Sequence, residues 1–449
     1  MAIVALSTPP GRSGIGVIRL SGPDSLSIAG KLTNDPNFTP TPNTTTLRSI
    51  FDPYTGALLD QAVITYFKSP HSFTGEDIIE LSCHGSPVLL TTIIDLTLSL
   101  GAHAAGPGEF TLRALANGRI NLTQAEGIRD LIDAQTESAA RQAARQLRGE
   151  LSNRLQPLKD LLIEIIVPLE SSLEFVEDDL PDLAVASISA KLELLRDQLI
   201  DLSNSFRSGR LLREGLKVVL VGRPNVGKSS VFNKLLAMER AIVTPIAGTT
   251  RDSLTERIAL NGVPVQLTDT AGIRSSSDAI ESMGVERTRN ALADADLVLV
   301  ILDGSLPLTA EDHDVLAEVQ SSKQLIVINK TDLSSKLDST VLKENVSTVR
   351  ISAKTGAGFD ALRTAIMAPF ASGDLGGDSF VITNSRHYDL LVRAGASVSD
   401  ALVHLNQRAS EELTLVGLHD ALRFLGQITG ETTPDDILSQ IFLTFCIGK

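Results

Sequence analysis

The chain has 449 residues, of which 43% are hydrophobic and 21% are charged; this is enough for about three domains with cores of their own and excludes a disordered protein. Its formal net charge of -14 repels polyanions at long range, so any contact with nucleic acid needs a local patch or a partner. Its two cysteines, Cys83 and Cys446, lie far apart, which excludes a disulfide scaffold and fits a reducing compartment.

No segment of the sequence has the pattern of a signal peptide or a membrane span. Residues 1–12 lack a basic cluster and a long apolar run, and the most apolar later stretch, 158–173, is interrupted by charged residues and by Pro168. We therefore expect a cytoplasmic protein that does not bind a membrane.

Strand-like runs alternate with turn residues through the first part of the chain. The apolar stretch 88–100 predicts a buried helix among them. We therefore expect an α+β domain over residues 1–118. Its β-branched runs, which predict strands, cover 15–20, 62–67 and 78–81.

From about residue 119 the spacing of apolar residues becomes helical. Ile128, Leu131 and Ile132 fall on such a spacing, and a longer stripe follows over 188–202. Stripes of this kind usually face a core. The acidic stretch 174–182 predicts a solvated loop between helices.

Strand-like and helix-like runs then alternate, as in a nucleotide-binding α/β domain. Within this segment Asn261-Gly262 predicts a tight hairpin, which gives one antiparallel pair in an otherwise parallel sheet. A glycine-bearing linker at 371–380 follows, and helical patterns resume over 386–405, 411–425 and 434–446. The simplest arrangement is an inserted domain at 212–377 and a helical domain made of 119–211 and 378–449.

The inserted domain begins with the most specific motif of the chain. The run Gly222-Arg223-Pro224-Asn225-Val226-Gly227-Lys228-Ser229-Ser230 follows strand-like residues 217–221 and leads into a helix-like run. Strand, glycine-rich loop and helix are the context of a P-loop, in which backbone N–H groups and the helix N-terminus receive phosphate. In such a loop Lys228 reaches the β- and γ-phosphates and Ser229 binds Mg²⁺.

Further segments of a GTP site follow, each after a strand-like run. In Asp269-Thr270-Ala271-Gly272, the aspartate can hold Mg²⁺ through water and the glycine can donate its N–H to the γ-phosphate. In Asn329-Lys330-Thr331-Asp332, the Asp332 carboxylate can accept from both the ring N–H and the amino group of guanine. Adenine offers no such pair, so GTP is predicted rather than ATP. Ser352-Ala353-Lys354 would support the base through backbone N–H.

The residues that would carry out hydrolysis are predicted from the surrounding segments. Within Gly248-Thr249-Thr250-Arg251-Asp252, we select Thr250 to close on Mg²⁺ when the γ-phosphate is present. Small GTPases orient water with a glutamine where this chain has Ile273, so an acid of the next segment is expected to serve. The side-chain amide of Asn225 could bind a monovalent cation against the phosphates, together with carbonyls of 244–249. The candidate acids are Asp278, Glu281 and Glu286.

Cys446 allows two interpretations. A prenylation signal is disfavoured, because Lys449 is a poor terminal residue for one and Gly448 is not aliphatic. The thiol is then either buried at the end of a helix, or delivered by the tail into a pocket of another domain.

Together these motifs resemble the MnmE (TrmE) family of tRNA-modification GTPases over essentially the whole chain. The GTPase motifs are shared with many families, whereas the N-terminal segments and the Cys-Ile-Gly-Lys ending are specific to this one. The segments that carry the resemblance are 8–12, 72–77, 107–110, 222–230, 247–252, 269–272 and 445–449.

The resemblance implies a multidomain α/β protein with a tetrahydrofolate-binding, dimerising domain at 1–118, a discontinuous helical domain and an inserted GTPase domain. It implies a homodimer that joins MnmG, a flavoprotein with FAD and NADH, in a heterotetramer or larger complex. Together they would add an aminomethyl or carboxymethylaminomethyl group to carbon 5 of the wobble uridine of certain tRNAs, with 5-formyl- or methylene-tetrahydrofolate as one-carbon source. GTP hydrolysis, dependent on K⁺ and on contact between two GTPase domains, would drive an open–closed cycle.

The resemblance also implies site residues, position by position. Glu281 matches the acid that orients the hydrolytic water, and Cys446 matches a cysteine implicated in modification. Arg119 stands where some members carry Lys, a cation of different shape. The implied ligands are Ser229 and Thr250 for Mg²⁺; Asn225, Thr244, Ile246 and Thr249 for K⁺; and Arg19, Glu80, Arg119 and Lys449 for folate. The implied GTP-binding set is Asn225, Val226, Gly227, Lys228, Ser229, Ser230, Thr244, Pro245, Ile246, Ala247, Gly248, Thr249, Thr250, Asp269, Thr270, Ala271, Gly272, Asn329, Lys330, Asp332, Ser352, Ala353 and Lys354.

Other functions remain open at this point. A GTPase of ribosome assembly would share the nucleotide motifs, but it predicts a basic RNA-binding domain, and only scattered basic residues such as Arg207 and Arg210 are present. A regulatory switch that makes no modification would be favoured by loss of folate binding. A purely structural protein conflicts with the complete nucleotide site.

Overall fold

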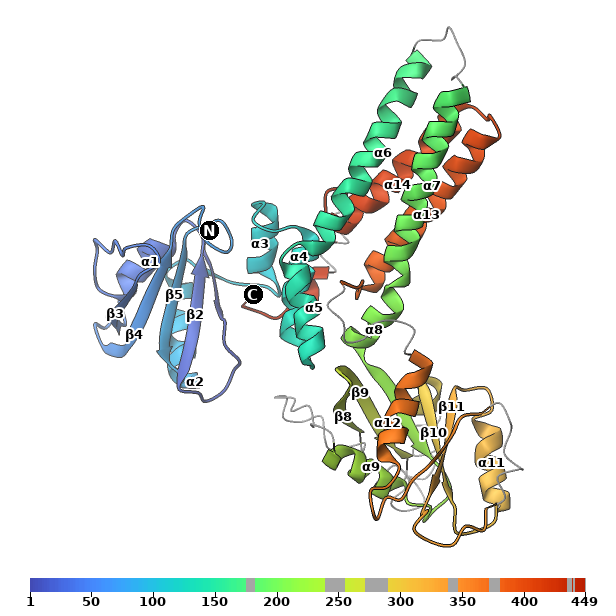
Figure 1. The fold of residues 1–449 in the computed structure, drawn as a ribbon. Helices are drawn as coiled ribbons and strands as arrows, with labels where there is room; N and C mark the ends of the chain where they lie inside the picture. The colour runs from blue at the N-terminus through green and yellow to red at the C-terminus, as the bar shows by residue number, and fades with distance from the viewer. Residues whose placement is uncertain are drawn as a thin grey trace. The chain divides into compact units, whose positions relative to one another are not determined.

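Over the residues that it describes, the computed structural model shows a multidomain α/β chain with two six-stranded sheets and a set of long helices (Figure 1). The chain forms two compact units: Met1–Arg129, Gln146–Asp160 and Leu422–Lys449 make up the first, and Asp130–Arg145 with Leu161–Ala421 the second. The residues that the structure describes are 1–174, 182–238, 255–270, 290–337, 346–370, 380–433, 438 and 441–448.

The N-terminal sheet comprises β1 (Ile3–Leu6), β2 (Ile15–Ser21), β3 (Thr45–Phe51), β4 (Leu58–Phe67), β5 (Ile78–His84) and β6 (His103–Ala104), accompanied by helices α1 (Ser25–Leu32), α2 (Pro87–Ser99) and α3 (Glu109–Ala116). Its strand order is β3-β4-β5-β2-β1-β6, antiparallel except between β1 and β6. The predicted strands and the predicted helix are confirmed.

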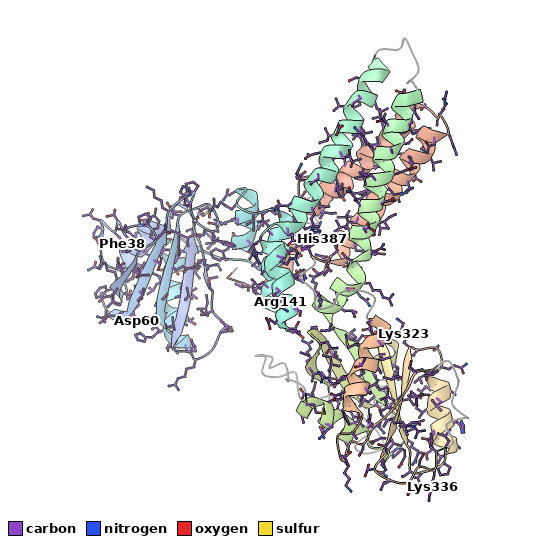
Figure 2. The ribbon with its side chains drawn as sticks, in the orientation of Figure 1. Phe38, Asp60, Arg141, Lys323, Lys336 and His387 are labelled. Atoms are coloured by element: carbon purple, nitrogen blue, oxygen red, sulfur yellow. The ribbon has the colours of Figure 1, made fainter. Side chains whose placement is uncertain are left out.

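One face of this sheet packs against α1 and α2. Ile18 and Leu81 of the sheet and Ile93 of α2 are fully buried there, and Phe38, labelled in Figure 2, belongs to the same core. Arg19 and Glu80 lie opposite each other in the register of β2 and β5. Because side chains alternate along a strand, these two project from the other face of the sheet.

Further helices are α4 (Leu122–Asp133), α5 (Glu137–Leu147), α6 (Glu150–Glu174), α7 (Asp182–Asn204), α8 (Phe206–Glu214), α13 (Ser385–Asn406) and α14 (Glu411–Thr429), of which α6, α7 and α13 are the longest. The predicted stripe in α7 is confirmed: Leu192, Leu195 and Leu199 are buried, and α7 packs against α13.

The prediction of which face of α4 is buried is wrong. Leu131 and Ile132 are 37% and 42% exposed, whereas Leu122 and Ala125 are fully buried. The reason is that the latter pack with Phe442 and Phe445, a partner segment that local spacing does not reveal.

The second sheet comprises β7 (Leu216–Val221), β8 (Thr255–Leu260), β9 (Val263–Asp269), β10 (Leu297–Asp303), β11 (Gln324–Asn329) and β12 (Thr348–Arg350), with helices α9 (Lys228–Met238), α11 (Ala310–Glu318) and α12 (Phe359–Met367) and the short 3₁₀ helix η3 (Ala368–Phe370). Its order is β12-β11-β10-β7-β9-β8. The pair β8–β9 is antiparallel and the other pairs are parallel, as predicted.

Hydrophobic clusters cover both faces of the second sheet. The strands β7, β9, β10 and β11 run in parallel, so their carboxyl ends meet at one edge of the sheet. The residues at these ends are Gly222, Asp269, Asp303 and Asn329.

Among the helices in the described ranges, none combines the length and the apolar character that crossing a membrane requires. The predicted acidic loop at 174–182 and the predicted linker at 371–380 lie almost wholly outside the described residues. Of the helix predicted over 434–446, the structure describes 438 and 441–446.

Candidate functional site

The P-loop lies at the carboxyl end of β7, where close contacts require two glycines. Gly222 has a φ of 150°, and a Cβ added to it would lie 2.5 Å from the carbonyl oxygen of Ile301. Gly227 has a φ of 97°, and an added Cβ would overlap the amide of Asn329. Both positions favour glycine because the chain passes so near its neighbours.

Lys228 and Ser229 begin α9 directly after this loop. Lys228 is 8% exposed, and its Nζ donates to the carbonyl oxygens of Gly222 at 2.7 Å and Arg223 at 2.9 Å. Ser229 Oγ donates at 2.7 Å to Oδ2 of Asp269, which is fully buried. Hydroxyl and carboxylate oxygens are the ligands that Mg²⁺ prefers, so this pair fits the predicted magnesium site.

The segment after β11 contacts the P-loop through a side chain. Asn329 Nδ2 donates to the Val226 carbonyl at 2.9 Å, and Asn329 Oδ1 accepts from the backbone N–H of Ala353 at 3.0 Å. The amide of Asn329 therefore joins the loop that would hold phosphate to the loop that would support the base.

Asp332 is oriented by the third of these segments. Its Oδ1 accepts from Ser352 Oγ at 2.7 Å. This hydrogen bond lowers the pKa of Asp332, so the carboxylate is ionised and can accept from a base. Of the other predicted residues, Thr270 donates its hydroxyl to the Leu220 carbonyl, and Ser230 and Lys354 are exposed.

Several predicted residues lie outside the described ranges, and their roles stay predictions. Of the residues assigned to K⁺, the structure describes Asn225, which is exposed and has a φ of 64°. The residues outside the described ranges are Thr244, Pro245, Ile246, Ala247, Gly248, Thr249, Thr250, Ala271, Gly272, Asp278, Glu281, Glu286 and Lys449.

The sequence analysis missed two buried carboxylates at the nucleotide site. Asp303 accepts from Lys330 Nζ at 2.6 Å, Asp312 of α11 accepts from Arg223 Nε at 3.1 Å, and both carboxylate side chains are 4% exposed. Asp303 ends a buried strand just as Asp269 does, a signal that could have found it. Asp312 lies within a helix and gives no such signal.

The first unit holds a second polar cluster, made by residues predicted to contact folate. Arg19 Nε and Nη2 contact Oε1 of Glu80 at 2.8 and 2.7 Å. The Arg19 guanidinium lies 5.7 Å from the ring centroid of Phe110, and its Nη1 donates to the Gly448 carbonyl at 3.4 Å. The Arg19 and Glu80 side chains keep 19% and 23% exposure, so a ligand can reach them.

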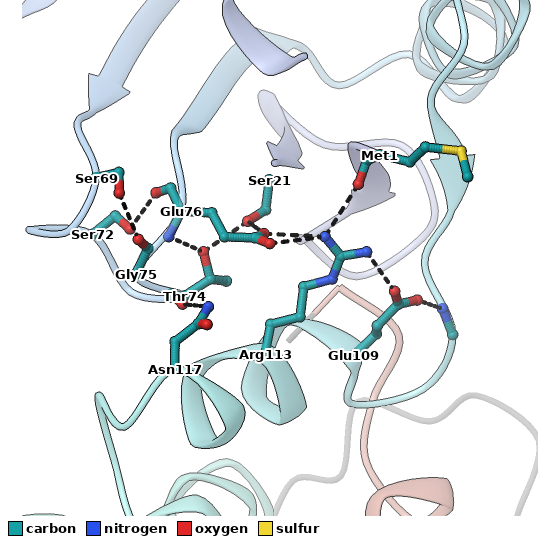
Figure 3. A network of polar contacts seen from close by, with 11 residues as sticks. Met1, Ser21, Ser69, Ser72, Thr74, Gly75, Glu76, Glu109, Arg113 and Asn117 are labelled. Carbon is teal, nitrogen blue, oxygen red and sulfur yellow. Dashed lines mark hydrogen bonds and ion pairs between the residues drawn. The ribbon is translucent and has the colours of Figure 1, made fainter. Parts of the chain in front are cut away.

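Arg113 of α3 lies at the centre of a polar network in the same unit (Figure 3). Its guanidinium contacts Glu76 at 3.1 Å and Glu109 at 2.9 Å, and donates to the Met1 carbonyl at 3.3 Å. Burial alone would lower the pKa of Arg113, but the two carboxylates raise it above its usual value. The network therefore keeps its charges and joins α3 to Glu76.

The segment 72–76, which contains Glu76, is held to the residues that follow α3 by two further hydrogen bonds. Asn117 Nδ2 donates to the Thr74 carbonyl at 2.7 Å, and Arg119 Nε donates to the Ser72 carbonyl at 3.2 Å. Arg119 is otherwise exposed. Its guanidinium is thus oriented by the backbone at one edge while staying accessible to solvent.

Cys446 lies in a tail that docks within the first unit. Ile447 forms an isolated antiparallel β-bridge with Pro107, and the Gly108 N–H donates to the Cys446 carbonyl at 3.3 Å. The Gly448 carbonyl accepts from Ser7 Oγ at 3.0 Å. Cys446 itself is exposed, so the interpretation of a thiol buried at a helix end is wrong. The backbone of the tail, rather than the thiol, makes these contacts.

The chain is similar to known proteins over its whole length. The family model of the MnmE helical domain matches residues 122–446, and that of the GTP-binding protein TrmE N-terminus matches residues 2–119. The tRNA modification GTPase MnmE of Koribacter versatilis is 45% identical over 451 residues, covering 100% of this chain and 99% of that protein. Proteins of the same name from Natranaerobius thermophilus and Aquifex aeolicus are 40% identical, with the same coverage.

Solved structures match part of the chain. The G domain of the FeoB iron transporter of T. maritima is 27% identical and covers 35% of this chain and 99% of its own. The TM-score of this match is 0.28.

Proposed function

The chain belongs to the MnmE family of tRNA modification GTPases, and from this premise we propose that it hydrolyses GTP to GDP and phosphate in order to modify tRNA. The observation that carries the proposal is that the P-loop meets Asp269 and Asn329 at one sheet edge, in a chain similar to these GTPases over its full length. Lys228 would bind the phosphates, and Asp332 would bind guanine.

The finer proposal concerns the reaction on tRNA. With the FAD- and NADH-dependent partner MnmG, in a heterotetramer or larger complex, a homodimer of this chain adds an aminomethyl or carboxymethylaminomethyl group to carbon 5 of the wobble uridine. A 5-formyl- or methylene-tetrahydrofolate supplies the one-carbon unit when bound. The residues that would hold the folate are Arg19, Glu80, Arg119 and Lys449. Their guanidinium and carboxylate groups can pair with the pterin and glutamate groups of a folate.

Metal ions would act on the nucleotide. Ser229 and Thr250 would hold Mg²⁺, which balances charge on the phosphates. Asn225, which is exposed, would offer its amide oxygen to K⁺ together with Thr244, Ile246 and Thr249, and Glu281 would orient the water. Hydrolysis compared in potassium and sodium tests the role of Asn225, because equal rates would remove the potassium proposal.

Nucleoside mass spectrometry on tRNA tests the function as a whole. A bacterium that lacks its own MnmE is complemented with this chain and its matching MnmG, or with the Cys446→Ser variant and the same MnmG. Return of the modified wobble uridine supports the proposal, and failure of the expressed variant assigns Cys446 to the chemistry. No return, from a protein that is expressed and hydrolyses GTP, would favour a regulatory GTPase instead.

A further inference from the structure

A lysine within the predicted guanine-binding segment 329–332 bridges the P-loop and a buried carboxylate. Lys330 has a φ of 62°, and its Nζ donates to Asp303 Oδ2 at 2.6 Å and to the Asn225 carbonyl at 2.9 Å. The Lys330 side chain is 32% exposed and that of Asp303 is 4% exposed. The ammonium is therefore anchored from inside the domain and reaches outward to the loop.

The anchor itself is fixed in place. The other oxygen of Asp303, Oδ1, accepts from the backbone N–H of Ser305 at 3.0 Å and from its hydroxyl at 2.6 Å. The Gly304 N–H donates to the Asn329 carbonyl at 2.9 Å, which ties the ends of β10 and β11 together. Burial raises the pKa of Asp303, but the hydrogen bonds from Lys330 and Ser305 outweigh it and lower the pKa below its usual value. Asp303 thus stays ionised beside the lysine.

The Asn225 carbonyl, to which Lys330 donates, belongs to the same peptide group as the N–H of Val226. A trans peptide is planar, and its C=O and N–H point in opposite directions. When Lys330 holds the Asn225 carbonyl, the N–H of Val226 points in the opposite direction within the same peptide plane. Asn329 holds the next carbonyl, that of Val226, at 2.9 Å, and so orients the N–H of Gly227 in the same way. Backbone N–H groups are what a P-loop offers to phosphate.

We propose that Asp303 is a positioning residue for phosphate binding: it holds Lys330 over the Asn225 carbonyl and thereby fixes the peptide whose N–H receives phosphate. The inference rests on the proposed binding of a guanine nucleotide at this loop. It assigns to Asp303 a role that is exerted through Lys330, at a distance from the nucleotide. It also makes the affinity for phosphate depend on a residue that need not touch any part of the ligand.

The full chain with Asp303→Asn tests the inference, because asparagine keeps the shape of the side chain and removes its charge. We expect the Kd for fluorescently labelled GDP to rise about tenfold, mainly through faster dissociation, since a charge-assisted hydrogen bond is lost. The Kd for guanosine, which lacks phosphate, should change by less than about twofold. Ser305→Ala is the matched control: it removes a hydrogen bond from the same carboxylate but leaves Lys330 paired, and it should leave both Kd values within about twofold.

Lys330→Met removes the same bridge from its more exposed end and serves as the test if Asp303→Asn folds poorly. It should also weaken GDP more than guanosine. Where both variants fold, the double variant Asp303→Asn/Lys330→Met should bind GDP about as weakly as whichever single variant binds it more weakly, because both changes break the same Asp303–Lys330 interaction. An unchanged Kd for GDP, equal weakening of guanosine, or full additivity of the two changes would overturn the inference. If the unaltered chain binds no GDP, the proposed function fails before Asp303 is tested.

Discussion

We propose that the charge of Asp332 determines which base the nucleotide site accepts. The hydrogen bond from Ser352 lowers the pKa of Asp332, so at neutral pH an ionised carboxylate would meet the two donors of a bound guanine. Asp332→Asn offers one donor and one acceptor, the pattern that xanthine requires. We expect calorimetry to show GDP binding about a hundredfold more weakly to this variant, and xanthosine diphosphate binding more tightly than to the unaltered chain. Retained preference for GDP would remove Asp332 from base recognition.

The two cysteines differ in a way that a thiol reagent can measure. Cys83 is 2% exposed, and burial together with the nearby Asp60 carboxylate raises its pKa to about 12. At pH 8 only about one Cys83 in ten thousand is a thiolate, the form that reacts. Cys446 is exposed. We expect a maleimide to label one thiol of the native chain rapidly and Cys446→Ser to abolish that labelling. Rapid labelling of the variant would show that Cys83 is accessible.

At the scale of the helix, two buried glycines have opposite expected effects. Alanine favours a helix over glycine by up to about 1 kcal/mol, but a Cβ at Gly209 of α8 would overlap the Ile382 carbonyl. A Cβ at Gly395 of α13 would only touch Leu199, at 3.9 Å. We therefore expect Gly209→Ala to destabilise the fold by about 1–3 kcal/mol and Gly395→Ala to stabilise it slightly.

Thermal unfolding of the two glycine variants, measured side by side, checks this expectation. The midpoint should fall for Gly209→Ala and rise or stay constant for Gly395→Ala. If both rise, helix propensity outweighs the contact with Ile382, and the close packing of α8 against that segment is not what stabilises the domain.

Secondary-structure elements were predictable from the sequence where neighbouring residues determine them. Contacts between residues far apart in the sequence were not predictable. The hairpin at Asn261-Gly262 needs two residues with positive φ, here 49° and 81°, and the sequence supplies the pair that tolerates this. The buried face of α4 depends on Phe442 and Phe445, which follow far along the chain. The role of Asp303 depends on β10 and β11 being neighbours, which periodicity alone does not state.

At the scale of the whole molecule, the two candidate ligand sites belong to different units. The P-loop lies in the second unit, whereas the Arg19–Glu80 pair lies in the first together with the docked tail. The tail contributes the Gly448 carbonyl to this pair through Arg19. Each site therefore has its own local framework, and a change to the tail should act on one of them.

A chain that ends at Phe445 tests this separation. The shortened chain lacks the Gly448 carbonyl, which accepts from Arg19 and Ser7, and it also lacks Lys449. We therefore expect 5-formyl-tetrahydrofolate to bind at least about tenfold more weakly. Affinity for GDP should stay within about twofold. Cys446→Ser, which keeps the tail backbone, is the control and should retain both affinities in calorimetry. Unchanged folate binding by the shortened chain would mean that the docked tail is not part of that site, and a loss of both affinities would mean that the tail supports the whole fold.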